Sequence, residues 1–206
     1  MSRFGDDPHA FFDAVYRETA PWDIGEAQPA LMQLLAELPP RGPVLDVGCG
    51  SGDLAVALAR LGYETIGIDF VASAIELARS RAAGLPEDVQ KRVRFEVGDA
   101  LHPSQWGEAP GAVVDSGFLH LFERDARERF VAELASVLPH GARYYLLAFA
   151  VTFPIEHGPL AIDANEVATL FSAERGWRLV TCGPAEFVSR IAPVPATLAC
   201  AERAGR

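Results

Sequence analysis

Glycine and aspartate residues with the spacing of a ligand-binding turn lie in the stretch VLDVGCGSGDLAVALARLGYETIGID, from Val44 to Asp69. The stretch reads as a buried strand, a glycine turn, an amphipathic helix and a second strand that ends in an acid. Gly48, Gly50 and Gly52 follow the first strand directly. A tight turn that lets a ligand approach the backbone requires glycines at such positions. The pattern predicts a turn that holds a cofactor.

The acids around this turn favour a cationic cofactor. A dinucleotide site follows GxGxxG, with the helix N-terminus against a pyrophosphate, whereas this turn reads GxGxG and has Asp53 where the third glycine belongs. A carboxylate repels a pyrophosphate, but it suits S-adenosylmethionine (SAM), which carries a positive amino group and a sulfonium. The first predicted strand and the ends of the later ones supply further acids: Asp46, Asp69, Asp99 and Asp115. We therefore predict SAM; plain helix capping is the alternative role for Asp53.

An alternation of strand and helix patterns positions these residues. The predicted strands cover residues 44–47, 64–68, 92–97, 112–115, 143–149, 177–182 and 196–202. Helices are predicted between most of them, including one at about 124–137 and one that begins with a capping box at Asp163 and Glu166. The last two strands have no helix between them and should pair antiparallel. We predict an α/β fold with a doubly wound, Rossmann-like, seven-stranded sheet, mostly parallel with an antiparallel last strand.

The N-terminal segment is predicted to be a helical lid. Asp7 is a candidate cap and Pro8 stands at the first helical position. A second helix follows, because its leucines recur at helical spacing, and PPRGP ends it. We expect one domain over residues 1–206, with the lid at 1–40 and the SAM-binding core at 41–206.

Composition limits the classes of partner. The net charge is −10, and no cluster of basic residues is present to bind a nucleic-acid backbone or an anionic membrane surface. No apolar run reaches the roughly 18 residues of a membrane span, and the first residues show no signal-peptide core, so we expect a cytoplasmic protein. The three cysteines and five histidines lack the spacing of metal ligands, and no metal is expected. The oligomeric state is not visible in the sequence, and a monomer is the default.

Residues 42–149 resemble a class I SAM-dependent methyltransferase. VLDVGCGSG resembles the first motif of that family, IGIDF the second and VGDA the third, and the helixless pair of final strands matches the family's antiparallel seventh strand. The resemblance implies that Gly48, Gly50 and Gly52 shape the pocket around the methionine part of SAM, beside Cys49, and that Asp46 supports its amino end. Cys49 itself is interpreted as a packing residue.

The same resemblance implies the contacts of the nucleoside. Asp69 should accept hydrogen bonds from both ribose hydroxyls, and Phe70 should pack on the adenine ring. Asp99 should meet the adenine amino group, and the amide of Ala100 a ring nitrogen. At the end of the fourth strand, Asp115 and Ser116 should bring backbone carbonyls to the amino group of SAM. The product of the cofactor would be S-adenosylhomocysteine (SAH).

The stretch DSGFLHLF, which follows the fourth strand, supplies the candidate residues of the methyl-acceptor site. It should place Phe118 and His120 over the methyl end of the cofactor. His120 is the candidate general base or acceptor-positioning residue, and local hydrogen bonding is the alternative. Enzymes that methylate exocyclic amines of nucleic-acid bases resemble one another in a [DNS]PP[YFW] motif at this position. DSGF departs from that motif, which favours a small-molecule acceptor.

Aromatic residues are predicted to enclose the acceptor. The stretch ETAPWDIGEAQPAL resembles the N-terminal segment of small-molecule methyltransferases in the thiol, thiopurine and heterocyclic-toxin group. The likeness implies that Phe12, Tyr16 and Trp22 form a lid that contacts cofactor and acceptor, opposite a wall that consists of Phe118, Phe149 and Phe153. The alternative is that these aromatics belong to the ordinary core, with Trp22 as a staple between helices.

Three functions remain open from the sequence. The first is methyl transfer to a small aromatic or heteroaromatic hydroxyl, thiol or similar nucleophile. The second is methyl transfer to a halide, a metalloid or a metabolite carboxylate, in which His120 has no role as a base. The third is a protein that binds SAM without turnover, or an oxidoreductase that uses a dinucleotide.

Overall fold

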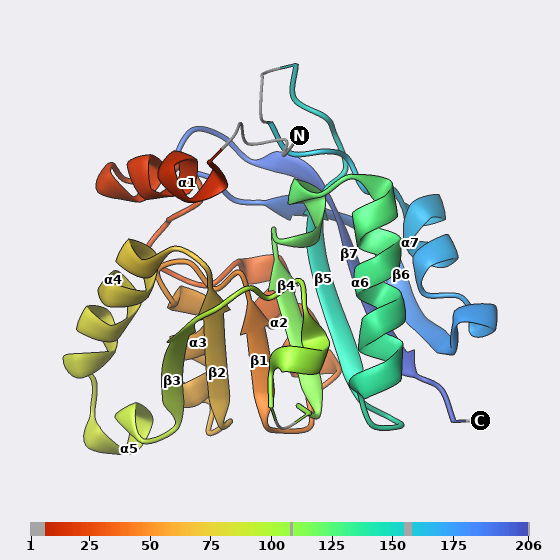
Figure 1. The fold of residues 1–206 in the computed structure, drawn as a ribbon, viewed down its shortest axis with the longest axis horizontal. Helices are drawn as coiled ribbons and strands as arrows, with labels where there is room; N and C mark the ends of the chain where they lie inside the picture. The colour runs from red at the N-terminus through yellow and green to blue at the C-terminus, as the bar shows by residue number, and fades with distance from the viewer. Residues whose placement is uncertain (1–6, 108, 155–157, 206) are drawn as a thin grey trace.

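A seven-stranded sheet forms the centre of the computed structural model, which describes residues 7–107, 109–154 and 158–205 (Figure 1). Across the sheet the strand order is β3-β2-β1-β4-β5-β7-β6. The strands are β1 (Val44–Val47), β2 (Thr65–Asp69), β3 (Val93–Val97), β4 (Ala112–Ser116), β5 (Arg143–Phe149), β6 (Trp177–Phe187) and β7 (Val194–Arg203). The first five run parallel, whereas β7 pairs antiparallel with both β5 and β6. The predicted fold class is confirmed.

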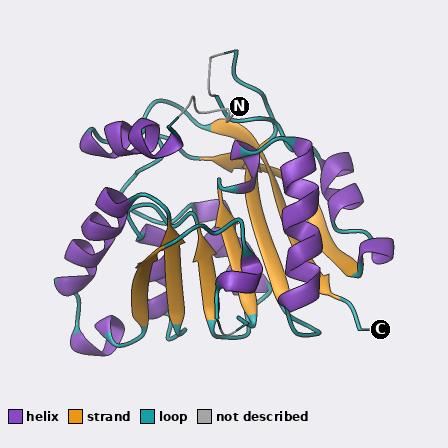
Figure 2. Cartoon of the chain, viewed as in Figure 1, coloured by secondary structure: helices purple, strands orange, loops and turns teal. Residues whose placement is uncertain are grey.

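Helices cover both faces of this sheet (Figure 2). They are α1 (Pro8–Arg17), α2 (Pro29–Glu37), α3 (Asp53–Arg60), α4 (Ala72–Ala83), α5 (Glu87–Gln90), α6 (Arg124–Val137) and α7 (Ala164–Leu170), with 3-10 turns η1 (Pro103–Gln105), η2 (Leu119–Leu121) and η3 (Ala173–Arg175). Neighbouring residues of β4 show the two faces: Val113 packs in the cluster with α6 and α7, and Val114 in the cluster with α2 and α3. No helix in the described ranges is long and apolar enough to cross a membrane.

The order of the strands sets the place of the site. Chain connections run outward in opposite directions from β1 and β4, which lie side by side at the centre of the sheet. In doubly wound sheets the ligand binds beyond the carboxyl ends of the strands at such a reversal. The glycine turn after β1 and the DSGF stretch after β4 therefore meet at one place.

The predicted lid divides into two parts with different roles. Figure 1 shows α1 beyond the carboxyl ends of the strands, where Phe12 packs with Val71 and Ala74. By contrast, α2 lies on a face of the sheet, its buried leucines belong to the core, and the Tyr145 hydroxyl donates to the Leu38 carbonyl at 2.7 Å. Of the described residues of the predicted lid, only α1 and the loop after it cover the site, because the apolar stripe of α2 is buried against the sheet. The first six residues of the predicted lid lie outside the described residues.

The sixth strand is longer than its predicted span of residues 177–182. It continues through Pro184 to Phe187 and remains paired with β7 over this length. Pro184 is tolerated because β6 is an edge strand, where a missing N–H need not interrupt the ladder. The extension carries Phe187 to the carboxyl end of the sheet, beside the ring of Phe149 at 4.8 Å between centroids.

Candidate active site

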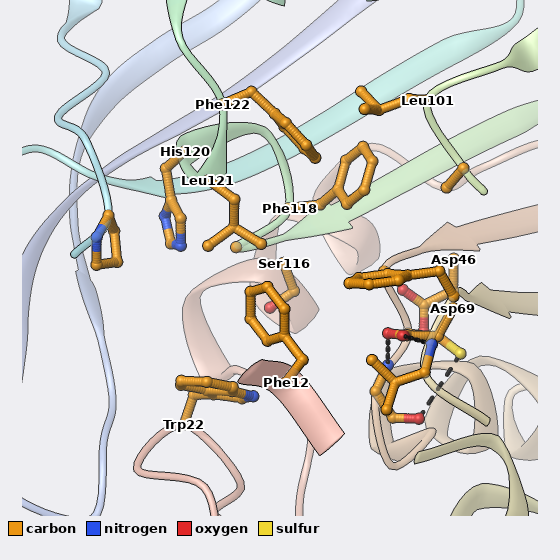
Figure 3. A pocket seen from close by; sticks show the side chains of 18 of the residues that line it. Phe12, Trp22, Asp46, Asp69, Leu101, Ser116, Phe118, His120, Leu121 and Phe122 are labelled. Atoms are coloured by element: carbon orange, nitrogen blue, oxygen red, sulfur yellow. Dashed lines mark hydrogen bonds between the residues drawn. The ribbon is translucent and has the colours of Figure 1, made fainter. Parts of the chain in front are cut away.

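One cavity of about 950 Å³ opens where the glycine turn and the DSGF stretch meet. Ligand pockets commonly enclose about 300–1,000 Å³, so this volume has room for a cofactor and a second small molecule. Figure 3 shows Asp46 and Asp69 at one end, which we call the carboxylate end, and His120 and Leu121 at the other, which we call the aromatic end. Most of the predicted site residues line the cavity: Phe12, Tyr16, Trp22, Asp46, Gly48, Cys49, Gly50, Asp69, Phe70, Asp99, Ala100, Ser116, Phe118, His120 and Phe149.

The glycine turn is part of the carboxylate end. Gly48, Gly50 and Gly52 have φ values of 64°, 51° and 85°, a left-handed conformation that favours glycine. At Gly50 a Cβ atom would lie 2.5 Å from the Tyr16 hydroxyl oxygen, so Tyr16 rests against the turn. Gly52 is not among the lining residues, and a Cβ atom there would meet the ring of Phe95 at 2.7 Å. Its part in the turn is therefore close packing.

Asp69 ends β2 with a buried carboxylate that braces the turn. Its two oxygens accept hydrogen bonds from the amides of Gly50 and Val71, each at 2.9 Å. A carboxylate offers about four acceptor positions, so the two amides do not use its full capacity to accept hydrogen bonds from a ligand in the cavity. Burial raises the pKa of Asp69 above its ordinary value, although the backbone hydrogen bonds act in the opposite direction.

Asp46 has a buried carboxylate oxygen without a hydrogen-bond partner in the part of the chain that the structure describes. Its side chain is buried in β1, and its Oδ2 atom has no hydrogen-bond partner among the described residues. Burial raises the pKa of Asp46 well above its ordinary value, and the neighbouring carboxylates of Asp115, Asp69 and Asp53 add to the effect. A buried acceptor without a partner is costly, and a cationic donor in the cavity would relieve that cost.

Arg81 of α4 connects the loop after α1 to the helix after the glycine turn. One of its guanidinium nitrogens donates to Asp23 at 3.0 Å, and another donates to Asp53 at 3.0 Å. Burial raises the pKa of Asp53, while the charge of Arg81 opposes the rise. Asp53 is thus a paired residue at the first position of α3, after Gly52 as the cap. Its charge is partly neutralised, which weakens its part in the argument for a cationic ligand.

The predicted nucleoside contacts stand along one side of the cavity. Phe70 packs edge-to-face against His9 and Phe12 of α1, at 4.6 and 5.5 Å between centroids. Asp99 is exposed, and one of its oxygens accepts from the Leu101 amide at 2.9 Å. Cys49 is a free thiol whose pKa burial raises well above the ordinary value. This cysteine is therefore protonated, in keeping with packing.

Asp115 has a structural role in the turn after β4. Its buried carboxylate accepts from the amides of Phe118 at 2.7 Å and Leu119 at 3.0 Å, and from the Tyr144 hydroxyl at 2.6 Å. Burial raises its pKa to about 6. The side chain does not line the cavity, whereas the next residue, Ser116, does. Any contact of Asp115 with a ligand would have to use its backbone carbonyl, as the sequence predicts.

His120 lies at the aromatic end, held on two sides. Its Nδ1 atom accepts a hydrogen bond from the Phe149 amide at 3.1 Å, and its ring stacks on the Phe149 ring at 4.5 Å and 18°. Only 4% of its surface is exposed. Burial lowers the pKa of His120 to about 3, and the charge of Arg127 contributes to the shift. The imidazole is therefore neutral at physiological pH.

Comparison with known proteins identifies the family. A family model described as "Methyltransferase domain" matches residues 44–141. Over 184 residues the chain is 30% identical to the 2-heptyl-1-hydroxyquinolin-4(1H)-one methyltransferase of Mycobacteroides abscessus, an alignment that covers 84% of this chain and 79% of that protein. The chain is a class I SAM-dependent methyltransferase.

Solved structures share the architecture of this methyltransferase. One comes from work on the conversion of a disulfide bond into a thioacetal group during echinomycin biosynthesis; it is 32% identical, has a TM-score of 0.80 and covers 95% of this chain and 93% of its own. A SAM-dependent methyltransferase from Anabaena variabilis, at 19% identity and a TM-score of 0.73, covers 95% of this chain and 93% of its own. The latter likeness shows the fold alone.

The carboxylate end of the methyltransferase fits SAM. The unpartnered Oδ2 of Asp46 matches the positive amino group, and the unused acceptor positions of Asp69 match a pair of hydroxyl donors. Gly48 and Gly50 of the glycine turn line the same end of the cavity. These are the features that the family resemblance predicts for the methionine and ribose parts of the cofactor.

The aromatic wall of the methyltransferase differs from its predicted composition. Phe118 and Phe149 line the cavity, but Phe153 does not, because it packs edge-to-face against Phe149 at 5.3 Å between centroids. Phe187 takes the predicted place of Phe153 in the wall. No short motif marks Phe187, since its position depends on the length of β6.

Two polar residues of the N-terminal segment have structural partners. Asp23 pairs with Arg81. Gln28 exchanges two hydrogen bonds with the backbone of Val188, at 2.9 and 2.8 Å. Trp22, which directly precedes Asp23, is 38% exposed and lines the cavity near Tyr16, at 6.3 Å between ring centroids.

Proposed function

We propose that this methyltransferase transfers the methyl group of SAM to an oxygen or sulfur nucleophile on a small aromatic or heteroaromatic molecule. The observation that carries the proposal is a single cavity with two chemically different ends. The carboxylate end suits the cationic cofactor, and the aromatic end suits a flat, apolar acceptor. Transfer is an in-line displacement at the sulfonium carbon, so alignment of the two molecules in one cavity supplies much of the catalysis.

The cofactor would lie along the carboxylate end. In this arrangement Asp46 accepts from the amino group, Asp69 accepts from the ribose hydroxyls, and Phe70 packs on the adenine. Asp99 and the amide of Ala100 meet the edge of the adenine ring. Gly48 and Gly50 let the methionine part approach the backbone, and Tyr16 and Trp22 cover it from the lid.

The acceptor would lie among the rings of the aromatic end. Phe118, Phe149 and Phe187 provide flat apolar surfaces, which favour an aromatic molecule through stacking and edge-to-face contacts. The relative from Mycobacteroides abscessus acts, by its name, on a hydroxyquinolone, and the echinomycin-related structure concerns sulfur chemistry. Both relatives support an acceptor that attacks through oxygen or sulfur. The net charge of −10 favours a small molecule over a nucleic acid.

The proposal is tested by SAH release from SAM with purified protein, across a panel of phenols, hydroxyquinolines, aromatic thiols and halides. We expect turnover with hydroxy-heteroaromatics or thiols, and none with halides. Asp69→Ala serves as the negative control, since it should lose the cofactor. Tight binding of SAM without turnover on any aromatic hydroxyl or thiol would contradict the proposed acceptor class, and turnover confined to halides would replace it.

A further inference from the structure

The orientation of the His120 ring is fixed by its neighbours. The Phe149 amide donates to Nδ1 at 3.1 Å, and the Phe149 ring stacks on the imidazole. Rotation of the ring by half a turn would place a carbon atom against that amide and leave the donor unpaired. The structure therefore assigns the two ring nitrogens: Nδ1 is the acceptor, and Nε2 is the free nitrogen.

This assignment determines where the proton lies. A neutral imidazole carries one proton, on the nitrogen that does not accept a hydrogen bond. Since the lone pair of Nδ1 is directed at the Phe149 amide, the proton is on Nε2. Nε2 is then a donor with no lone pair to receive a further proton. A general base needs the reverse arrangement.

The free nitrogen is available to a molecule in the cavity. His120 lines the cavity, and Nε2 makes no hydrogen bond within the described part of the chain. On one side the ring edge lies against Gly117, where a Cβ atom would come within 3.3 Å of Nε2. Figure 3 shows the ring beside Leu121, with Trp22 below it and Phe12 below it and to the right.

The charged surroundings of His120 also oppose its protonation. Arg127 of α6 is buried behind the turn, where it donates to the carbonyls of Leu119, Leu160 and Ala161 and pairs with Glu166 at 2.8 Å. The aromatic side chains from β5 and β6 that face the ring, Phe149 and Phe187, have no charge. Glu123 and Asp125 are the cavity-lining carboxylates nearest to His120 in the sequence, and both are exposed to solvent.

We propose that the acceptor binds as an anion that is already ionised in solution. The Nε2–H group of His120 then donates a hydrogen bond to an acceptor oxygen over which the negative charge of the anion is delocalised. This inference rests on the proposed methyl transfer. His120 is thus a positioning and selectivity residue. The site should select hydroxyls made acidic by conjugation to a carbonyl, a nitro group or a ring nitrogen, over simple phenols and alcohols.

The transfer step then moves no proton. A lone pair of the acceptor anion forms the bond to the methyl carbon, and the carbon–sulfur bond breaks with its electron pair left on sulfur. The sulfonium becomes the neutral thioether of SAH, and the acceptor becomes a neutral methyl ether. The proton of the acceptor has passed to water before binding. Opposite charges in a water-poor cavity attract each other more strongly than in bulk water, which favours the ionised acceptor beside the cofactor.

The test uses 4-nitrophenol, whose neutral and anionic forms differ in their visible absorption. We would titrate it with the full chain in the presence of SAH, which prevents turnover, over a range of pH. The expected result is that bound nitrophenol ionises at a lower pH than free nitrophenol. If the bound form stays neutral at a pH where the free compound is ionised, or if no nitrophenol binds, the proposal is wrong.

Two variants separate donation from shape. His120→Phe keeps a ring to stack on Phe149 but has no donor, and we expect it to bind nitrophenolate about 10- to 100-fold more weakly. His120→Gln keeps an N–H donor and should recover much of that loss. Unchanged affinity for SAH would show that both variants are folded. Equal loss in both variants, or equal affinity for the neutral and anionic forms, would overturn the assignment.

Rates distinguish this proposal from a base and from failure of the proposed function. With phenols of graded acidity, the acidic limb of kcat/KM should follow the pKa of each acceptor and persist in His120→Gln. If the acidic limb of kcat/KM instead falls at the same pH for every acceptor and is lost in both His120 variants, His120 acts as the base. If no acceptor is methylated while nitrophenolate still binds through His120, the proposed function fails and the anion site stands.

Discussion

The carboxylate end and the aromatic end of the cavity are built in different ways. At the carboxylate end, backbone amides hold the key groups: Gly50 and Val71 both donate to Asp69. At the aromatic end, side chains from separate strands meet, as Phe149 of β5 and Phe187 of β6 do at 4.8 Å between centroids. We therefore expect cofactor recognition to depend on the backbone of a short stretch, and acceptor recognition to depend on the length and register of distant strands.

This difference has a functional consequence for the family fold. At the aromatic end, Phe118 packs against Gly48 of the glycine turn, where a Cβ atom would lie 2.7 Å from its ring. Phe149 and Phe187 instead pack against each other and against His120, so changes at these two positions should leave the turn in place. One cofactor site can then serve different acceptors. It follows that substitutions at the carboxylate end should alter SAM affinity, and those at the aromatic end should alter the acceptor KM. Each prediction below tests one side of that separation.

The largest effect is expected at Asp69. Asp69→Ala removes the proposed acceptor for two ribose hydroxyls and the brace for the Gly50 amide. Each hydrogen bond to a charged group contributes about 1.5–3 kcal/mol, so SAM affinity should fall about 100-fold or more. Calorimetry measures the affinity for SAM. Asp88→Ala, which removes an exposed carboxylate of α5, is the matched control. Unchanged affinity in Asp69→Ala would remove the assignment.

A smaller effect with a pH signature is expected at Asp46. Burial raises the pKa of Asp46 well above its ordinary value, so the free protein takes up a proton there at a higher pH than an exposed carboxyl does. The cationic amino group of SAM stabilises the carboxylate, so binding should release protons, and affinity should rise with pH until Asp46 is ionised in the free protein. Asp46→Asn should abolish this release and weaken binding about tenfold.

Calorimetry in two buffers with different ionisation enthalpies counts the protons. Equal proton release in the wild type and in Asp46→Asn would assign the titration to another group. Asp69→Asn provides the comparison, because it tests the second buried carboxylate of the same end.

Phe187 and Phe153 form a matched pair at the aromatic end. Phe187→Leu removes a ring that lines the cavity, and we expect the acceptor KM to rise about two- to tenfold, since one aromatic contact contributes about 0.5–1.5 kcal/mol. Phe153 packs against Phe149 and does not line the cavity, so Phe153→Leu should leave the acceptor KM nearly unchanged. SAM affinity should stay the same in both. Equal effects on KM, or a change in SAM affinity, would break the separation between the ends.

The smallest effect is expected at Arg81, which joins the loop of Trp22 to α3 through Asp23 and Asp53. Its side chain is 34% exposed, so each ion pair is worth only about 0–1 kcal/mol. Arg81→Gln should weaken SAM binding about two- to fivefold at low salt and less at high salt. Arg92→Gln, which breaks an exposed pair with Asp88, is the control. An effect that is independent of salt would rule out an electrostatic link.

The sequence predicts local structure well where a single segment determines it. The helix over Arg124–Val137 agrees with its predicted span, and Asp163 accepts from the Glu166 amide at 2.8 Å as its capping box predicts. The spacing of Gly48, Gly50 and Gly52 likewise predicts the cofactor turn. These features depend on neighbours within a few residues, and such neighbours are visible in a one-dimensional pattern.

Features that depend on distant partners could not be predicted in this way. The pairing of Arg81 with Asp23 joins residues 58 positions apart, and no pattern relates them. Phe187 reaches the cavity only because β6 continues past Pro184, a residue that reads as the end of a strand. For His120, the sequence indicates a place near the acceptor, but its proton depends on the Phe149 amide in another strand.

Pro184 has a further consequence at the surface. It stands in β6, the longest strand and an outer edge of the sheet, and the register of β6 against β7 shifts between Leu179 and Thr181. An exposed edge strand normally offers a regular row of donors and acceptors to which another polypeptide can add. The proline and the irregularity interrupt that row, so a second chain finds no continuous template there. The edge is thereby protected against strand-to-strand aggregation.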